Sequence, residues 1–142
     1  MGLTPSPDNA AEIAGMVIPF VEKNYGVTLD YSVQSLRQID GLIDDLRQDH
    51  KFEDLQPLLF SVGCYVGEVF VRHAQGTWRT SASAGMASLA SSPIVVVMPD
   101  GRGCNPVGKT YKRFQNGPTD NLAYFYHVMV NVPPDALGKK RA

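Results

Sequence analysis

The segment from Gly103 to Thr110 has the spacing of a phosphate-binding loop, in which a second glycine is followed by a lysine and a threonine. In such a loop, backbone N–H groups surround the phosphates, Lys109 would contact the β and γ phosphates, and the Thr110 hydroxyl would bind Mg²⁺. A nucleotide-binding sheet needs several parallel strands, whereas the preceding sequence is mainly helical and only 32 residues follow. Asn105-Pro106 is also typical of an ordinary helix start. Phosphate or nucleotide binding through this loop is therefore the alternative function.

A stripe of polar side chains interrupts an otherwise apolar helical pattern at Ser61, Tyr65, Glu68 and Arg72. Glu68 and Arg72 are one helical turn apart, in the order that favours an ion pair. Glu68 lies between two valines, and a partly buried carboxylate needs partners. Two interpretations stay open: a structural anchor that holds the Asn105 loop or a strand end, and a site for a ligand or partner.

Two other charged groups have both a functional and a plain interpretation. Lys109, Lys112 and Arg113 form a basic patch on one short predicted helix, which could contact an acidic partner or a phosphate. Asp40 and Asp44 are one helical turn apart and could form a carboxylate pair. In both cases the pattern favours a solvated charged face.

Nucleophilic and metal chemistry find little support in the spacing. Cys64 and His73 are nine residues apart on one helix, more than about 13 Å along its axis, so they cannot pair directly. Nothing in the spacing of Cys104, His127 and Asp100 supports a catalytic set. The three histidines are scattered, and two cysteines are too few for a disulfide framework. The sequence therefore predicts a protein that is not an enzyme and has no cofactor or metal.

Composition and charge limit the classes of protein to which this chain can belong. The 142 residues are typical of one domain, and a formal net charge of -1 argues against nucleic-acid binding. No secretory signal begins the sequence, and no apolar run is long enough to cross a membrane. We therefore predict a single cytoplasmic domain over residues 1–142, with a flexible Ser/Ala/Gly-rich loop at 81–92, a frayed tail at 133–142, and no membrane partner.

Periodicity and capping residues predict an α+β fold. Four or five helices pack on a small, mostly antiparallel sheet of two or three strands, and the helix over 54–73, apolar on two of three sides, is central. For residues 122–130, the side-chain propensities favour a strand and the capping residues favour a helix. We expect a helix. A proline at position 19 is expected to interrupt the first helix. The expected helices cover residues 7–25, 32–46, 54–73, 105–115 and 122–130, and the strands 76–80, 94–98 and 102–104.

The chain also carries a combination of short motifs between residues 28 and 130. They include Leu29-Asp30-Tyr31-Ser32, the helix Gly63-Cys-Tyr65-Val-Gly67-Glu68 followed by Arg72, Trp78, Asn105-Pro106 with Lys109 and Lys112, and Asn116-Gly117 with Asp120. On these residues it resembles a group of small bacterial domains of unknown function. The resemblance implies no activity, and it accounts for Asn105-Pro106 and Lys109 without a phosphate loop.

Together these observations predict a non-catalytic protein-interaction or regulatory module of bacterial type, whose partner is another protein. The comparison with small immunity or adaptor proteins is one of size and style alone. The candidate binding residues are those of the polar stripe, the following strand and the basic helix: Tyr65, Glu68, Arg72, Trp78, Asn105, Lys109 and Lys112.

Overall fold

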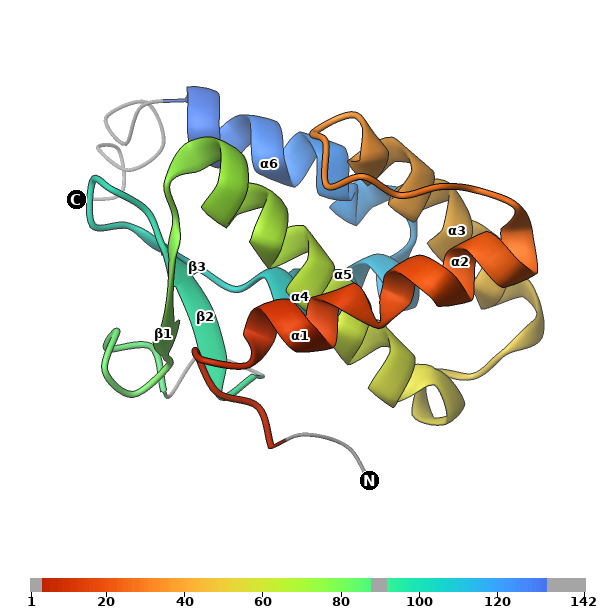
Figure 1. Ribbon diagram of the computed structural model, residues 1–142, viewed down its shortest axis with the longest axis horizontal. Coiled ribbons are helices and arrows are strands. Elements are labelled where there is room, and N and C mark those ends of the chain that lie inside the picture. Colours follow the sequence, from red (N-terminus) through yellow and green to blue (C-terminus); the bar gives the residue numbers. More distant parts are fainter. Residues whose placement is uncertain (1–3, 88–91, 133–142) are drawn as a thin grey trace.

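The centre of the molecule is the long helix α4 (Phe52–Ala74), against which most other elements pack (Figure 1). The structure, a computed structural model, describes residues 4–87 and 92–132. Every residue of α4 from 62 to 70 is buried, so each side of this stretch is covered by another part of the chain. The prediction of a central helix is confirmed, and it follows from the two apolar sides of the sequence pattern.

The first predicted helix is divided into α1 (Ala10–Gly15) and α2 (Val17–Tyr25), which cross α4 on one side (Figure 1). Pro19 explains the break, because it has no N–H to donate to the carbonyl of Gly15 and its ring crowds that carbonyl. The Met16 N–H bonds instead to the Ile13 carbonyl three residues back. Helix α2 ends at Gly26, whose φ of 67° is a left-handed conformation that glycine adopts at low cost.

Three helical elements complete the helical part on the other side of α4. These are α3 (Ser35–Asp49), α5 (Pro106–Asn116) and α6 (Leu122–Asn131), with the short 3₁₀ turn η1 (Pro118–Asp120) between the last two. Residues 122–130 are helical, as expected. The cap is Asn121, whose side chain accepts a hydrogen bond from the Tyr124 N–H, whereas the sequence suggests Thr119 or Asp120, which lie in η1. Phe70 of α4 packs on Phe125 and Tyr126 of α6, so the aromatic residues that favour a strand are used for helix packing.

The sheet within the described residues has three antiparallel strands in the order β1 (Thr77–Thr80), β2 (Ile94–Val97) and β3 (Gly103–Cys104). It lies at one end of the helices (Figure 1). The turn at Pro99–Gly101 makes the β2–β3 pair possible, with φ of 93° at the glycine. The predicted α+β class is confirmed, with its helices packed on a small antiparallel sheet.

Two glycines of α4 allow close approach of its neighbours. A Cβ at Gly63 would lie 2.6 Å from the Cα of Val107, so the backbone of α5 crosses α4 at this point. A Cβ at Gly67 would collide with the indole ring of Trp78 on β1. The small residues of the second apolar face therefore fix where α5 and β1 contact the central helix.

The segment predicted as a flexible loop is described only in part. Residues 81–87 form turns in which the Met86 N–H bonds to the Ser81 carbonyl, and Met86 packs on Gly103. Residues 88–91 of that loop and the predicted frayed tail at 133–142 lie outside the described residues. In the part of the chain that is described, no helix has both the length and the apolar character needed to cross a membrane.

Candidate interaction site

The polar stripe of α4 begins at the half-buried Ser61, and its next member, Tyr65, is fully buried. Its hydroxyl accepts a hydrogen bond from the Tyr31 N–H at 2.8 Å and lies 2.7 Å from the Ser35 hydroxyl. The rings of Tyr31 and Tyr65 stack with centroids 4.6 Å apart. Burial raises the pKa of the Tyr65 phenol. Tyr65 thus fixes the turn that leads into α3, including the positive φ of 64° at Tyr31.

Glu68 joins this stripe to the sheet. One carboxylate oxygen accepts from the indole Nε1–H of Trp78 at 2.9 Å, and the other from Arg72 Nε at 3.2 Å. The Arg72 guanidinium lies 3.7 Å from the centroid of the Tyr31 ring. Of the two open interpretations, the observed contacts match the structural one, in which Glu68 holds a strand end. We call Tyr31, Tyr65, Glu68, Arg72 and Trp78 the Tyr65–Glu68 cluster.

Burial decides which members of that cluster a partner could touch. Tyr65, Glu68 and Trp78 are 0%, 5% and 9% exposed, so they are part of the interior and present almost no surface. The Arg72 side chain is 47% exposed. Only Arg72 among these four candidate residues offers appreciable area for binding.

The Gly103–Thr110 segment has the geometry of an ordinary helix start. The Asn105 side chain accepts a hydrogen bond from the Gly108 N–H at 2.9 Å, and Pro106 is the first residue of α5. The Thr110 hydroxyl is buried and donates to the Pro106 carbonyl at 2.9 Å. The groups that a phosphate loop would aim at phosphate and Mg²⁺ are thus used inside the helix.

The two lysines of α5 differ in their surroundings. Lys109 Nζ lies 2.8 Å from a carboxylate oxygen of Asp120 and 5.7 Å from the ring centroid of Phe125. The hydrogen bond from Lys109 lowers the pKa of the Asp120 carboxyl. Lys112 is exposed, as a solvated face requires. Lys109 therefore ties α5 to η1 and α6, and it lies apart from the contacts of the Tyr65–Glu68 cluster.

The third member of the predicted basic patch, Arg113, is buried and does not lie on a solvated face. It is 1% exposed, and its Nε donates to Asp40 Oδ1 at 2.9 Å while its Nη2 donates to the Asp40 carbonyl at 3.1 Å. Its Nη1 lies 2.9 Å from Asp44 Oδ1. The prediction of solvated faces was wrong for Arg113 and Asp40, because each supplies the charge that allows the other to be buried.

Asp40 has further partners at the start of α6. Its two carboxylate oxygens accept hydrogen bonds from the Leu122 N–H at 2.9 Å and the Ala123 N–H at 3.1 Å. These are N–H groups of the first helical turn, which have no partner inside the helix, and the negative charge also suits that end of the helix dipole. We call Asp40, Asp44 and Arg113 with these N–H groups the Asp40–Arg113 cluster.

A signal for this cluster was present in the sequence. Asp40 follows Leu36 by four residues and precedes Ile43 by three, so helical spacing places it on the edge of the buried face of α3. A carboxylate at such a position needs a cationic partner or several donors. The identity of the partner was not visible, because Arg113 is 73 positions away.

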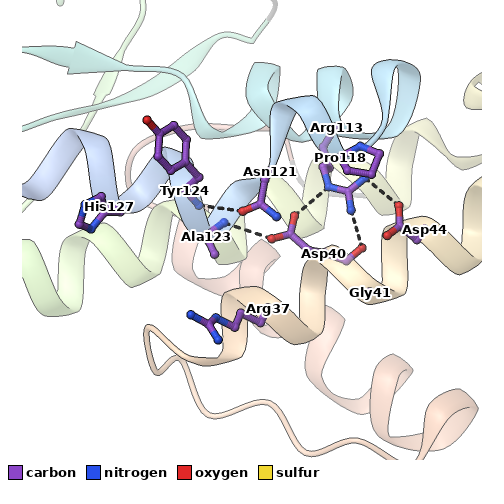
Figure 2. Close-up of a pocket in the computed structure, with 10 residues that line it drawn as sticks. All are labelled: Arg37, Asp40, Gly41, Asp44, Arg113, Pro118, Asn121, Ala123, Tyr124 and His127. Atoms are coloured by element: carbon purple, nitrogen blue, oxygen red, sulfur yellow. Dashed lines mark hydrogen bonds and ion pairs between the residues drawn. The ribbon is translucent and has the colours of Figure 1, made fainter. Parts of the chain in front are cut away.

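An open groove lies over the Asp40–Arg113 cluster, between α3 and α6 (Figure 2). It has a volume of about 760 Å³. A second hollow of about 490 Å³ shares three of its lining residues and continues it along the two helices. We call the two together the α3–α6 groove. Residues that line it include Arg37, Gly41, Asn121, Ala123, Tyr124, Tyr126 and His127.

Thiols, metal ligands and free carboxylates are the groups of the described residues that would support chemistry beyond binding. Burial raises the pKa of both thiols, Cys64 and Cys104, to about 12, so neither is a thiolate at neutral pH. Within residues 4–87 and 92–132, no three histidine, cysteine or acidic side chains are grouped so that they could hold a metal ion. Asp40 is engaged by Arg113 and by two N–H groups, which leaves it little capacity to act as a general base.

Residues 17–129 match the sequence pattern of a family of unknown function, DUF6278. The chain belongs to this family. The DUF6278 match runs from the start of α2 to Met129 in α6, so it includes both polar clusters and most of the groove. It confirms the expected resemblance to a family of unknown function. No curated protein and no solved structure matches the chain.

Proposed function

We propose that the chain is a non-catalytic protein-interaction or regulatory module of bacterial type, working in the cytoplasm, and that its partner binds along the α3–α6 groove. The observation that carries this proposal is Tyr124, which is 66% exposed at the groove wall (Figure 2). Tyrosine supplies a large contact area at low entropic cost and is enriched at protein interfaces. An aromatic side chain this exposed, beside a groove, suits a contact with another protein better than it suits a free surface.

The floor of the groove supports the same proposal because its position is fixed. Arg113 and Asp40 hold α5, α3 and the first turn of α6 together through buried charged hydrogen bonds. A groove whose walls are already placed loses little conformational entropy when a partner binds. On the α3 side of the groove, Gly41 has no side chain, and no atom lies within 4 Å of the position that its Cβ would occupy. The groove therefore stays open at this point.

Binding is favoured over catalysis by the state of the groups at the groove. Asp40 is engaged by Arg113 and by the start of α6, and Asp44 faces Arg113 at 2.9 Å. Neither carboxylate is poised as a free base, and no thiol lines the groove among the described residues. A rigid polar floor with an aromatic rim suits recognition of a protein surface.

The proposal is tested by affinity capture from a bacterial cell extract, followed by mass spectrometry. The native chain is compared with Tyr124→Ala and with the matched control Tyr25→Ala, which removes another exposed tyrosine (38% exposed) from α2. We expect a partner that Tyr124→Ala recovers at a level lower by about tenfold or more, the effect of losing an interface hot spot. Equal recovery by both variants, or no partner for the native chain, contradicts the proposal.

A further inference from the structure

One end of the α3–α6 groove is the hollow of about 490 Å³, whose polar lining comes from Gln34, Arg37, Tyr126, His127 and Asn131. We propose that this hollow binds the carboxylate of an aspartate or glutamate side chain in an extended segment of the partner protein. The inference rests on the proposed function and adds the chemistry of the partner. The volume of the hollow lies within the range of small-molecule binding pockets, about 300–1,000 Å³.

The charges of the lining favour an anion. Arg37 lines the hollow, and no aspartate or glutamate does so. The backbone N–H of Arg37 bonds to the Gln34 carbonyl, but among the described residues its side chain has no hydrogen bond or ion pair. Figure 2 shows its guanidinium apart from the dashed contacts of the Asp40–Arg113 cluster. Arg113, by contrast, already faces the carboxylates of Asp40 and Asp44. Arg37 is thus the cation whose charge a bound carboxylate would balance.

His127 adds a hydrogen-bond donor to the same hollow. The amide nitrogen of Asn131 lies 3.1 Å from His127 Nδ1. Because an amide nitrogen only donates, Nδ1 is the acceptor of this contact, and the proton of the neutral ring is on Nε2. His127 therefore presents an N–H donor to a ligand even when its ring is uncharged.

The Tyr126 hydroxyl provides a further donor at the hollow. Tyr126 is only 5% exposed, lines the hollow, and has no hydrogen-bond partner among the described residues. Burial raises the pKa of its phenol, so the hydroxyl keeps its proton and can donate. A carboxylate oxygen in the hollow would accept a hydrogen bond from this hydroxyl.

The apolar part of the lining fits the remainder of an acidic side chain. Val33 and Ala123 are partly buried at the core edge and line the hollow beside the polar groups. The methylene groups of a glutamate would contact them while its carboxylate reached Arg37, Tyr126 and His127. The site thus combines an apolar wall with convergent donors, the arrangement that orients a bound group.

The inference is tested by two-dimensional ¹H–¹⁵N NMR titration of the full chain with three capped pentapeptides. Each consists of alanine and phenylalanine around one central residue, which is glutamate, glutamine or lysine. We expect saturable shifts at the amides of Arg37, Ala123 and His127 with the glutamate peptide. The glutamine and lysine peptides should bind about tenfold more weakly, the difference expected for a lost charged hydrogen bond.

Single substitutions test whether the preference for the glutamate peptide depends on the hollow. Arg37→Ala should remove the preference for glutamate over glutamine, and Arg37→Glu should reverse it in favour of lysine. Lys23→Ala, which removes an exposed cation of α2 outside the hollow, should leave the preference unchanged. A preference that persists in Arg37→Ala, or that Lys23→Ala also removes, overturns the inference.

Other outcomes separate the inference from the proposed function. Equal binding of all three peptides at these amides overturns the carboxylate site and leaves the interaction groove standing. Free glutarate that binds as tightly as the glutamate peptide also overturns the inference, because the source is then a small acid. If no peptide shifts these amides, the inference falls, and Tyr124→Ala capture decides the proposed function separately.

Discussion

The Asp40–Arg113 cluster and the Tyr65–Glu68 cluster are built from similar groups, yet only the first lies beneath an open groove. In each, a nearly buried carboxylate accepts hydrogen bonds from an arginine and from a second donor. Glu68 is covered by the indole of Trp78, whereas Asp40 lies in the floor of the α3–α6 groove. Trp78 fills the space over Glu68, whereas no side chain of comparable size within residues 4–87 and 92–132 fills the space over Asp40.

The comparison teaches how burial of charge can serve two purposes. At Glu68 the carboxylate holds a tryptophan that seals the contact between α4 and β1. At Asp40 it fixes the walls of a cavity that stays open, because Gly41 and Ala123 contribute little volume to the rim. The two clusters should therefore differ in the size of their effect on stability and in their effect on binding.

The largest effect is expected for Asp40→Ala. The substitution leaves Arg113 buried without its main partner and removes acceptors from two N–H groups, so the free energy of unfolding should fall by about 3–5 kcal/mol. Urea unfolding measures the loss. The exposed neighbour on the same helix, Asp45→Ala, should change stability by about 0.5 kcal/mol or less. A loss below about 1 kcal/mol for Asp40→Ala would show that the buried pair does not hold the three helices together.

A smaller loss is expected for Trp78→Phe in the other cluster. The indole N–H donor to Glu68 disappears while the ring contact with Gly67 is partly kept, so one oxygen of a buried carboxylate loses its partner. The free energy of unfolding should fall by about 1–3 kcal/mol. Tyr25→Phe is the control for loss of an exposed aromatic polar group. If Trp78→Phe costs more than Asp40→Ala, the ranking of the clusters is reversed.

Arg72→Ala should cost about 0.5–1 kcal/mol. Its side chain is 47% exposed, so solvent screens its ion pair with Glu68, and its contact with the Tyr31 ring adds a modest amount. Thermal unfolding at low and high salt measures the effect, and the difference from the native chain should shrink with salt. A loss as large as that of Trp78→Phe would mean that Arg72 is part of the interior.

Acid should weaken the Asp40–Arg113 cluster through Asp44. The hydrogen bond with Arg113 lowers the pKa of Asp44 below its ordinary value of 3.8. This contribution to stability is therefore present above about pH 4 and is lost as the pH falls through the lowered pKa. The Tm decrease from pH 7 to pH 3 should be smaller in Asp44→Asn than in the native chain. Asp45→Asn should follow the native chain, and identical curves for all three would count against the Arg113 contact.

The smallest effect is expected at the Gly103–Thr110 segment, which has the spacing of a phosphate loop. ATP or GTP with Mg²⁺ should not raise the Tm, because the Gly108 N–H and the Thr110 hydroxyl are used within α5. Lys109→Ala should lower the free energy of unfolding by about 1 kcal/mol or less, through loss of the Asp120 pair, and Lys112→Ala by less. A Tm rise with nucleotide that Lys109→Ala abolishes would establish phosphate binding instead.

Much of the fold was predictable because it depends on local signals. Asn105-Pro106 at the start of α5, Gly26 at the end of α2, and the β-branched residues 94–97 each specify their conformation within a few residues. Helix α6 shows the limit of propensity, since its tyrosines and valines favour a strand in isolation. Its capping residue and its packing on Phe70 determine the helix.

The candidate site was predictable only in part. The Glu68–Arg72 pair is visible because its members are four residues apart, but its burial depends on Trp78, which belongs to a strand. Asp40 and Arg113 are joined by folding across 73 positions, and no local pattern relates them. The sequence shows Tyr124 only as one residue of an ambiguous segment, because its exposure follows from how α6 docks on α3.

The link between Asp40 and the start of α6 also constrains how the chain folds as it leaves the ribosome. Asp40 and Leu122 are 82 positions apart, so the carboxylate of α3 is synthesised well before either Arg113 or the N–H groups that complete it. Until then, α3 carries an unpaired charge on the face that will be buried, and docking of that face is unfavourable.

Final docking of α3 therefore waits for nearly the whole described chain. At about 5–20 residues per second, the delay between synthesis of Asp40 and of Leu122 is roughly 4–16 s. During this interval the nascent chain exposes the apolar residues of α3, which makes this stretch a natural target for chaperones that bind unfolded segments.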